Sequence, residues 1–148
     1  MKRRLYIMEY YQMPFFPKLM VRDIDKSAKF YEMSLGFESL FKYRNSKKEV
    51  IMNHLRLNKY QDIMLIQKSN FKAGSGIYLN LLVTDASEKI SQISPKAIQE
   101  PLSEKPWNAL EATIKDPDGY LITLTQPHVE QKDFDKLMRN ATKVFNKD

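Results

Sequence analysis

The chain has 148 residues and contains no cysteine, only two histidines and a single tryptophan. The absence of cysteine excludes disulfides, thiolate metal sites and cysteine nucleophiles, and it fits a reducing compartment. No stretch approaches the ~20 consecutive apolar residues that a membrane-spanning helix needs. The basic start at residues 2–4 resembles that of a signal peptide, but Glu9 and Gln12 interrupt the apolar segment that should follow it. We therefore expect a soluble, cytoplasmic protein.

Motifs for nucleotide binding and covalent catalysis are also missing. The sequence has no glycine-rich phosphate loop, no nucleophile elbow and no Ser/His/Asp arrangement. A net charge of +6 favours an acidic partner, but the basic residues are dispersed apart from those at 2–4 and 42–48. The second group contains Asn45 and Ser46 between two strand-like segments, which predicts a solvated hairpin loop. We therefore expect binding neither to nucleic acid nor to membranes.

The sequence does contain a short pattern that occurs twice. Residues 16–23 read FPKLMVRD and residues 78–85 read YLNLLVTD, so that Leu, Val and Asp recur 62 positions later. Each copy passes from a strand-like segment into a helix-like one. A second pair of similar segments follows at nearly the same distance, DIMLIQ at 62–67 and LITLTQ at 121–126. The chain is therefore predicted to use one module twice, with a shared cavity between the halves.

The first half predicts the order strand, helix and three strands. Pro17 indicates that the first strand, residues 16–22, begins there or lies at a sheet edge. Asp23 is a suitable N-cap, apolar residues then recur at helical spacing, and Gly36 ends the helix. Three strand-like segments follow at residues 37–43, 49–57 and 61–68.

The second half predicts the same order after a linker at residues 70–76, where Ala73-Gly74-Ser75-Gly76 is the most flexible composition in the chain. A strand at 77–83 and a helix capped by Asp85 come next. Asp116-Pro-Asp-Gly119 predicts a turn before the last strand, because proline fixes φ and glycine permits the corner. The three remaining strands are expected near residues 97–100, 110–115 and 120–126.

The end of the chain changes to helical periodicity. Residues 128–148 are predicted to contain an amphipathic helix that packs on the outer face of the sheet or on a second subunit. The expected organisation is a single domain with a first module at about 14–69, the linker, a second module at 77–127 and this helix. The apolar positions that define the helix face are Phe134, Leu137, Met138, Ala141, Val144 and Phe145.

Several of these segments together resemble a known family. They are Val21-Arg-Asp-Ile, Phe30-Tyr31, Leu35-Gly36-Phe37, Trp107, and Asp116-Pro-Asp-Gly119 followed by Ile122-Thr-Leu. In this order they resemble the vicinal oxygen chelate superfamily of glyoxalase I, extradiol dioxygenases, and fosfomycin- and bleomycin-resistance proteins, and the bleomycin-resistance branch in particular. The resemblance covers roughly residues 14–127. It implies an α+β fold of two tandem βαβββ modules whose curved mixed sheets form a cup, usually completed in a dimer.

In the enzymes of this superfamily, His, Gln or Glu from the first and last strand of each module hold a divalent metal. Such ions need imidazole or carboxylate donors. If the ligand positions were shifted by one or two residues along the strands, His54 and Glu111, which lie in corresponding strands, could serve as metal ligands. Two donors without a third do not make a stable metal site. We therefore expect no metal and no cofactor. The resemblance places the four ligand positions on side chains that are not suitable donors: Phe16, Met64, Tyr78 and Thr123.

Conspicuous polar and aromatic residues also have structural explanations. Asp23, Asp85 and Asp116 lie at helix caps or at a turn, so we expect them to serve the fold. Trp107 lies in a loop before a strand, where the family often carries a tryptophan close to the ligand. Core packing is the competing explanation for this side chain.

The leading hypothesis is a metal-independent homodimer that binds a small molecule, for instance an antibiotic or a toxic compound, in an aromatic-lined cup. Stacking of a planar or amphiphilic molecule needs ring faces and no ion. Two alternatives stay open: a metal-dependent lyase, isomerase or dioxygenase of the same superfamily, and an interaction module that uses the C-terminal helix. No catalytic residue is assigned. The predicted ligand-binding residues are Phe16, Tyr43, His54, Tyr78, Trp107, Glu111 and Thr123.

Overall fold

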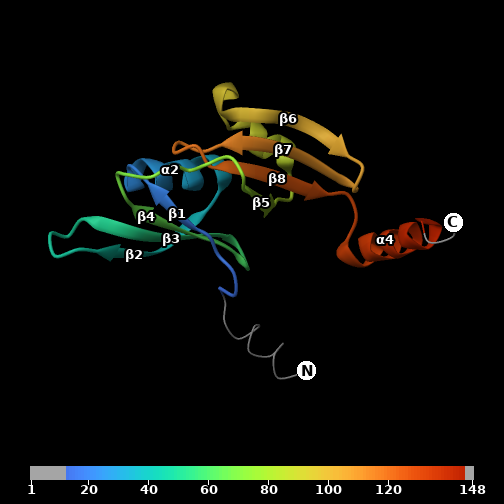
Figure 1. Ribbon diagram of the computed structural model, residues 1–148, viewed down its shortest axis with the longest axis horizontal. Helices are drawn as coiled ribbons and strands as arrows, with labels where there is room; N and C mark the ends of the chain where they lie inside the picture. Colours follow the sequence, from blue (N-terminus) through green and yellow to red (C-terminus); the bar gives the residue numbers. More distant parts are fainter. Residues whose placement is uncertain (1–12, 146–148) are drawn as a thin grey trace, which may run out of the picture.

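The computed structural model describes residues 13–145, which form two similar modules followed by a helix (Figure 1). The first module contains β1 (Lys18–Val21), α2 (Ile24–Leu35), β2 (Glu38–Arg44), β3 (Val50–Asn58) and β4 (Gln61–Gln67). The second contains β5 (Tyr78–Leu82), α3 (Ala86–Ser91), the short 3-10 helix η1 (Pro95–Ala97), β6 (Ile98–Lys105), β7 (Ala109–Lys115) and β8 (Leu121–Pro127). The final helix is α4 (Gln131–Phe145).

Each module forms its own four-stranded mixed sheet. The strand orders are β1-β4-β3-β2 and β5-β8-β7-β6, so the two sheets have the same topology. In each sheet the first strand pairs in parallel with the last, and the other pairs are antiparallel. The predicted α+β fold of two curved mixed sheets with a C-terminal helix is therefore confirmed.

The aspartates at the helix starts serve as caps, as predicted. The Asp23 carboxylate accepts a hydrogen bond from the Lys26 amide over 3.1 Å, and the Asp85 carboxylate accepts one from the Glu88 amide over 3.0 Å. These bonds satisfy amide groups that have no partner inside the helix. Gly36 ends α2 with φ of 81°, a left-handed conformation that glycine adopts without a steric penalty.

The third aspartate builds the turn between β7 and β8. The Asp116 side chain accepts hydrogen bonds from the amides of Asp118 and Tyr120, over 2.9 and 2.8 Å. Gly119 closes the turn with φ of 99°, and its amide donates to the Asp116 carbonyl over 3.1 Å. The expected structural role of Asp116 is thus confirmed.

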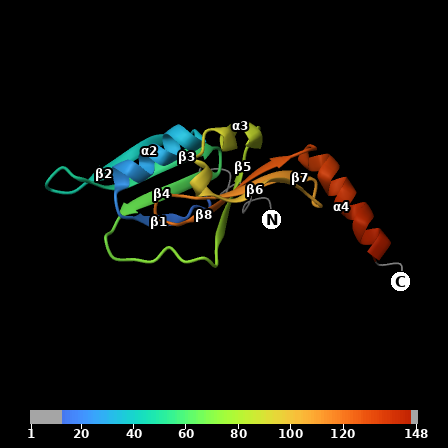
Figure 2. The same cartoon turned by 90° about the horizontal axis from the view of Figure 1, so that it is seen from above.

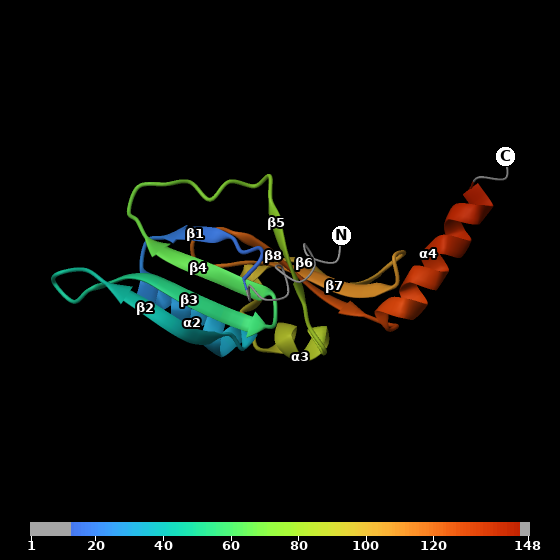
Figure 3. The ribbon, with the colours of Figure 1, turned by 90° about the horizontal axis from the view of Figure 1, so that it is seen from below.

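A single hydrophobic core joins both modules. The buried side of α2 presents Ile24, Ala28, Tyr31 and Leu35, and these pack in one cluster with residues of both sheets, including Leu55 and Leu124. Figures 2 and 3 show α2 on one face of the first sheet, with no described element on the other face. Complete burial of a leucine side chain contributes about 1.5–3 kcal/mol. The shared core therefore holds the two modules in a fixed relation.

Polar contacts reinforce this junction at several points. The Tyr120 hydroxyl donates to the Met20 carbonyl over 2.8 Å. The Gln61 side chain donates to the Leu82 carbonyl over 3.0 Å and accepts from the Leu82 amide over 2.6 Å. Both contacts satisfy backbone groups on the edge strands β1 and β5, which would otherwise be open to pairing with another chain.

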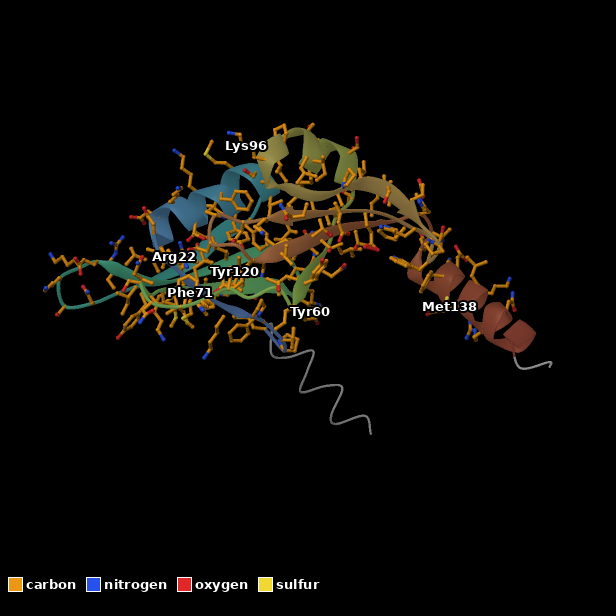
Figure 4. All side chains as sticks on the ribbon, turned by 45° about the horizontal axis from the view of Figure 1, so that its top comes forward. Arg22, Tyr60, Phe71, Lys96, Tyr120 and Met138 are labelled. Atoms are coloured by element: carbon orange, nitrogen blue, oxygen red, sulfur yellow. The ribbon has the colours of Figure 1, made fainter. Side chains whose placement is uncertain are left out.

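The aromatic ring of Phe71 attaches the linker to both modules. Phe71 lies between Arg22 of the first module and Tyr120 of the second (Figure 4). The Arg22 guanidinium carbon is 4.4 Å from the Phe71 ring centroid, and the Phe71 and Tyr120 rings stack at 6.3 Å with an interplanar angle of 5°. Arg22 also forms an ion pair with Asp118 at 3.3 Å.

The final helix α4 extends away from both sheets (Figures 1 and 3). Its residues Leu137 and Met138 are about half exposed. The predicted packing of this helix on the sheet is therefore not observed within the chain, and its packing on a second subunit stays a prediction. None of the helices in the described part of the chain is long and apolar enough to cross a bilayer.

Two strand boundaries differ from the prediction. The strand expected near residues 97–100 continues to Lys105 and contains Pro101. Because β6 lies at the sheet edge and its pairing with β7 shifts register around Pro101, the missing amide of proline disturbs no regular ladder. Strand β1 begins at Lys18, so Phe16 lies in the segment that leads into it.

Candidate functional site

Each sheet has one face that neither α2 nor α3 covers, and we call these the first and second open faces. Side chains alternate across a strand, and the buried residues Leu19, Leu55 and Leu65 mark the core side of the first sheet. The first open face carries the alternate residues Lys18, Met20, Glu38, Phe41, Tyr43, Met52, His54, Arg56, Asp62, Met64 and Ile66.

The centre of the first open face is apolar, and the charged side chains of Lys18, Glu38 and Arg56 lie around it. Methionines from β1, β3 and β4 and Ile66 form its centre, and Phe41 and Tyr43 lie at its margin on the edge strand β2. Phe41 pairs with His54 across the strands, and Tyr43 pairs with Met52. Methionine side chains are flexible and polarizable, so they adapt to the outline of an aromatic molecule. This face therefore offers an apolar surface that can adjust to what lies on it.

One polar cluster lies within this face. The Asp62 carboxylate is completely buried and accepts hydrogen bonds from Nε and Nη2 of Arg56, both over 2.7 Å. Nε2 of His54 lies 3.1 Å from Oδ2 of the same carboxylate. Burial raises the pKa of Asp62, but the hydrogen bonds from Arg56 and His54 outweigh it and lower the pKa below the usual value. Asp62 is therefore an ionised carboxylate that accepts all three bonds.

The second open face is polar. Its side chains come from β5, β6, β7 and β8, and they include two carboxylates, Glu100 and Glu111. Among the described residues neither carboxylate forms an ion pair. Its other polar members are Tyr78, Asn80, Ser103, Thr113, Thr123 and Thr125, and the same register adds the apolar residues Leu82 and Leu121.

A chain of hydroxyl groups runs across this second face. Oγ1 of Thr113 lies 2.8 Å from Oγ1 of Thr123 and 3.4 Å from Oε2 of Glu100. A hydroxyl has one proton, so if Thr113 donates to Glu100, Thr123 must donate to Thr113. The Tyr78 hydroxyl donates to Oε1 of Glu100 over 3.3 Å. The protons of these hydroxyls therefore point toward Glu100.

Trp107 lies at the turn between β6 and β7 and reaches back over the second face. Its Nε1–H donates to Oε1 of Glu111, which is buried. The neighbouring Asn108 has φ of 62°, a left-handed conformation that asparagine tolerates better than most residues. This turn geometry positions the indole beside the carboxylate.

The family model described as Glyoxalase/Bleomycin resistance protein/Dioxygenase superfamily matches residues 15–124. The chain belongs to this superfamily. The prediction from the sequence motifs is therefore confirmed at the level of the superfamily, while membership of the bleomycin-resistance branch stays a prediction. No curated protein matches the sequence.

Solved structures of superfamily type show the same fold. TioX from Micromonospora sp. ML1 is 18% identical, covers 78% of this chain and 98% of its own, and has a TM-score of 0.63. TnmS3, an antibiotic-binding protein from Streptomyces sp. CB03234, is 21% identical with coverages of 76% and 93% and a TM-score of 0.57. The trypanothione-dependent glyoxalase I of Leishmania major is 21% identical with coverages of 86% and 94% and a TM-score of 0.62. At these identities the likeness concerns the fold alone.

The structure divides the predicted site residues of this superfamily member between the two faces. Tyr43 and His54 lie on the first open face, and Tyr78, Trp107, Glu111 and Thr123 lie on the second. Phe16 is half-buried ahead of β1 and belongs to neither set. Four aromatic rings remain exposed across these faces: Phe41 by 61%, Tyr43 by 55%, Tyr78 by 51% and Trp107 by 51%.

The superfamily's metal site does not fit the residues of this chain. In the part of the chain that the structure describes, no three His, Cys, Asp or Glu side chains lie together as a metal would require. His54 and Glu111, the two donors considered from the sequence, lie on different sheets. His54 is bound to an arginine-paired carboxylate, and Glu111 to the Trp107 indole. These donors are therefore engaged within the protein.

Two hollows elsewhere on the molecule are poorer candidates. A cavity of about 160 Å³ lies beside the linker, where Leu19, Ala73 and Tyr120 line it. It is smaller than the roughly 300–1,000 Å³ of typical ligand pockets. A wider hollow of about 670 Å³ beside the start of α2 mixes Asp23 and Asp25 with Lys42, Arg44 and Lys48. Its mixed charges give no preference for ligands of either sign.

Sequence reasoning missed the partners that orient the predicted residues. Arg56 and Asp62 form an ion pair next to the turn between β3 and β4. On the second open face, the Glu100 carboxylate accepts hydrogen bonds from the hydroxyls of Tyr78 and Thr113. Opposite charges on the two sides of the turn at Lys59-Tyr60 were the available signal for the first pair, although a register shift between Arg56 and Asn58 brings them opposite each other. No such signal exists for Glu100, because its place depends on the irregular pairing of β6.

Proposed function

We propose that this chain is a metal-independent small-molecule-binding protein of the glyoxalase/bleomycin resistance type, and that its ligand binds on the open sheet faces. The observation that carries this proposal is the set of residues at the four positions where related enzymes hold a metal. The resemblance assigns these positions to Phe16, Met64, Tyr78 and Thr123, none of which is a suitable donor for a divalent metal. Met64 lies on the first open face and Tyr78 and Thr123 lie on the second, whereas Phe16 precedes β1.

The exposed aromatic side chains indicate that the ligand is flat and apolar. Phe41 and Tyr43 stand on the first open face, and Tyr78 and Trp107 on the second, each more than half exposed. Covering such a side chain contributes about 1.5–3 kcal/mol through removal of apolar surface from water. Offset stacking of rings adds about 0.5–1.5 kcal/mol per pair. A planar molecule that contacts several of these rings would therefore bind without a metal.

A homodimer would complete the site. One open sheet face is a single wall, whereas ligand pockets usually bury 70–90% or more of a drug-sized ligand. A second copy would provide the opposite wall and would cover exposed rings such as Phe41 and Tyr78. The structural likeness to the antibiotic-binding protein TnmS3 supports an antibiotic or a toxic compound as the ligand class. The absence of cysteine supports a cytoplasmic location.

The alternative of a metal-dependent lyase, isomerase or dioxygenase needs at least three protein donors around one ion. The described residues offer no such group. The likeness to the glyoxalase I of Leishmania major favours this alternative at the level of the fold alone. The interaction-module alternative receives support from the exposed residues Leu137 and Met138 on α4. An interaction module would also be expected to have a cup filled by its own side chains. The aromatic rings on both open faces are more than half exposed, so they are not covered by other side chains of the chain.

A thermal-unfolding panel tests the proposal. The protein is first treated with EDTA and then heated with a set of planar aromatic compounds, or with Mn²⁺, Ni²⁺, Zn²⁺ or Fe²⁺. We expect stabilisation by members of the aromatic set and none by the metals. Phe41→Ser and Tyr43→Ser should reduce the stabilisation, whereas Tyr60→Ser, in the turn between β3 and β4, should not. A stoichiometric bound metal with a large thermal shift would contradict the proposal.

A further inference from the structure

Several hydrogen-bond donors among the predicted site residues already donate to other groups of the protein. His54, Tyr78 and Trp107 each direct an N–H or O–H group to a carboxylate of this chain. Other donors remain on the two faces, among them Tyr43, Asn80 and Lys18 on edge strands and the remaining N–H groups of Arg56. Of the side chains in the middle of the first open face, His54 is the one whose second nitrogen has no partner among the described residues.

His54 gives the clearest case because its tautomer is determined. The ionised Asp62 carboxylate has no proton to donate, so Nε2 of His54 must donate its own proton over the 3.1 Å contact. In the neutral imidazole the other nitrogen, Nδ1, then holds a lone pair and no proton. Nδ1 has no hydrogen-bond partner among the described residues, and it is not one of the buried unpaired atoms of the structure. In the neutral imidazole Nδ1 is therefore an unpaired acceptor, on a side chain that is 11% exposed.

The surroundings of His54 fix which ligands can reach that acceptor. Across the strands it lies opposite Phe41 on one side and Met64 on the other. Arg56 holds Asp62 through two further hydrogen bonds, so the carboxylate that orients the imidazole cannot turn away. The result is a rigid acceptor between the apolar side chains of Phe41 and Met64, with Lys18 beyond Met64 on the edge strand β1. A donor that approaches it must come from a molecule that also fits these apolar side chains.

We propose that the ligand is a planar apolar molecule with an O–H or N–H group that donates a hydrogen bond to Nδ1 of His54. Such ligands include phenols, hydroxylated polycyclic compounds and aromatic amides. The inference rests on the proposed function, since it assigns a ligand class to the first open face. It makes His54 a specificity-determining residue. A ligand without a donor would leave the nitrogen desolvated and unpaired, which is unfavourable.

The test compares two probes of nearly equal shape, 2-naphthol and 2-methoxynaphthalene, by calorimetry on the full chain. The first carries an O–H donor and the second does not. Both are measured with the wild type and with His54→Phe, which keeps a ring but removes the acceptor. Asp62 keeps its two bonds from Arg56 in this variant, so the fold should persist, and thermal unfolding checks this.

We expect the preference of the wild type for 2-naphthol over 2-methoxynaphthalene to fall roughly five- to tenfold in His54→Phe. An unchanged preference in the variant would overturn the inference and leave the proposed function standing. If the wild type binds neither these probes nor the wider aromatic panel, the proposed function fails and the inference fails with it.

Nitrogen NMR gives a measurement that does not depend on the variant's fold. The chain has only two histidines, and His128→Gln leaves His54 as the single imidazole. We expect 2-naphthol to shift the Nδ1 resonance of His54 and 2-methoxynaphthalene to leave it near its free position. Equal shifts from both probes, or a proton found on Nδ1 in place of Nε2 in the neutral protein, would overturn the inference.

Discussion

The Tyr31 hydroxyl donates a hydrogen bond to Oδ2 of Asp116 over 2.7 Å, and both side chains are buried. This contact joins α2 of the first module to the turn between β7 and β8 of the second. Burial raises the pKa of Asp116 above its usual value. The hydrogen bonds from Tyr31 and from the turn amides lower this pKa but do not outweigh burial. Burial and the nearby Asp116 carboxylate raise the pKa of Tyr31 well above its usual value. The two modules thus share a polar anchor inside their common core.

Removal of this anchor should weaken the whole domain. Tyr31→Phe keeps the ring and removes the hydroxyl, which leaves the buried Asp116 carboxylate with one partner fewer. We expect the free energy of unfolding to fall by about 1–3 kcal/mol, measured by urea denaturation. Tyr60→Phe is the matched control, since Tyr60 is an exposed turn residue. A loss no larger than that of the control would show that the anchor is dispensable.

The linker should depend on the stack of Arg22, Phe71 and Tyr120 (Figure 4). Phe71→Ala removes the ring that lies between the two modules, so proteinase K should cleave within residues 70–76 faster than in the wild type. Lys72→Ala changes an exposed neighbour and should leave the cleavage rate unchanged. Equal rates for Phe71→Ala and the wild type would mean that other contacts hold the linker.

Acid should release the stabilisation that Asp62 provides. Its pKa is lower in the folded protein than in the unfolded chain, so this contribution is complete above about pH 4 and is lost as the pH falls through the folded value. Asp62→Asn should be less stable than the wild type by about 1–3 kcal/mol at pH 7. This difference should shrink on acidification in urea melts. A difference that stays constant from pH 7 to pH 3 would contradict the assignment.

Much of the fold follows from local patterns in the sequence. Asp23 and Gly36 delimit α2 as predicted, and Asp116 and Gly119 form the predicted turn, because caps and turns depend on near neighbours. The predicted end of β6 was wrong because the strand continues through Pro101. A strand tolerates proline at the edge of a sheet, and whether a strand lies at the edge depends on the whole sheet. Local patterns therefore sufficed wherever the determining contacts were local.

The candidate site was only partly predictable. Repeat register placed Tyr78 and Thr123 on one face, since strand alternation fixes the side of each residue. The tautomer of His54 depends on Asp62, and the direction of the Thr113 hydroxyl depends on Glu100. These contacts come from strand pairings whose register the sequence pattern does not specify.

Self-association should follow from the exposed rings of the open faces. Sedimentation equilibrium should give a mass twice that of one chain at micromolar concentration. Phe41→Ser should shift the population toward monomer, because Phe41 is a large exposed apolar residue on the first face. Leu137→Ser on α4 tests whether this helix contributes as well. A strictly monomeric wild type would contradict a cup completed by a second copy.

The most direct test of the central claim uses the fluorescence of Trp107, the only tryptophan in the chain. Its indole lies beside Glu111 on the second open face and is half exposed. The EDTA-treated protein is titrated with 2,6-dihydroxyanthraquinone, a planar molecule whose two hydroxyl groups lie away from its carbonyls and so neither bond to them nor chelate a metal. We predict saturable quenching without any metal, weakened in Tyr78→Ser, because Tyr78 lies on the same open face as Trp107. Quenching that appears only after addition of a divalent metal, or that never saturates, would contradict metal-independent binding on these faces.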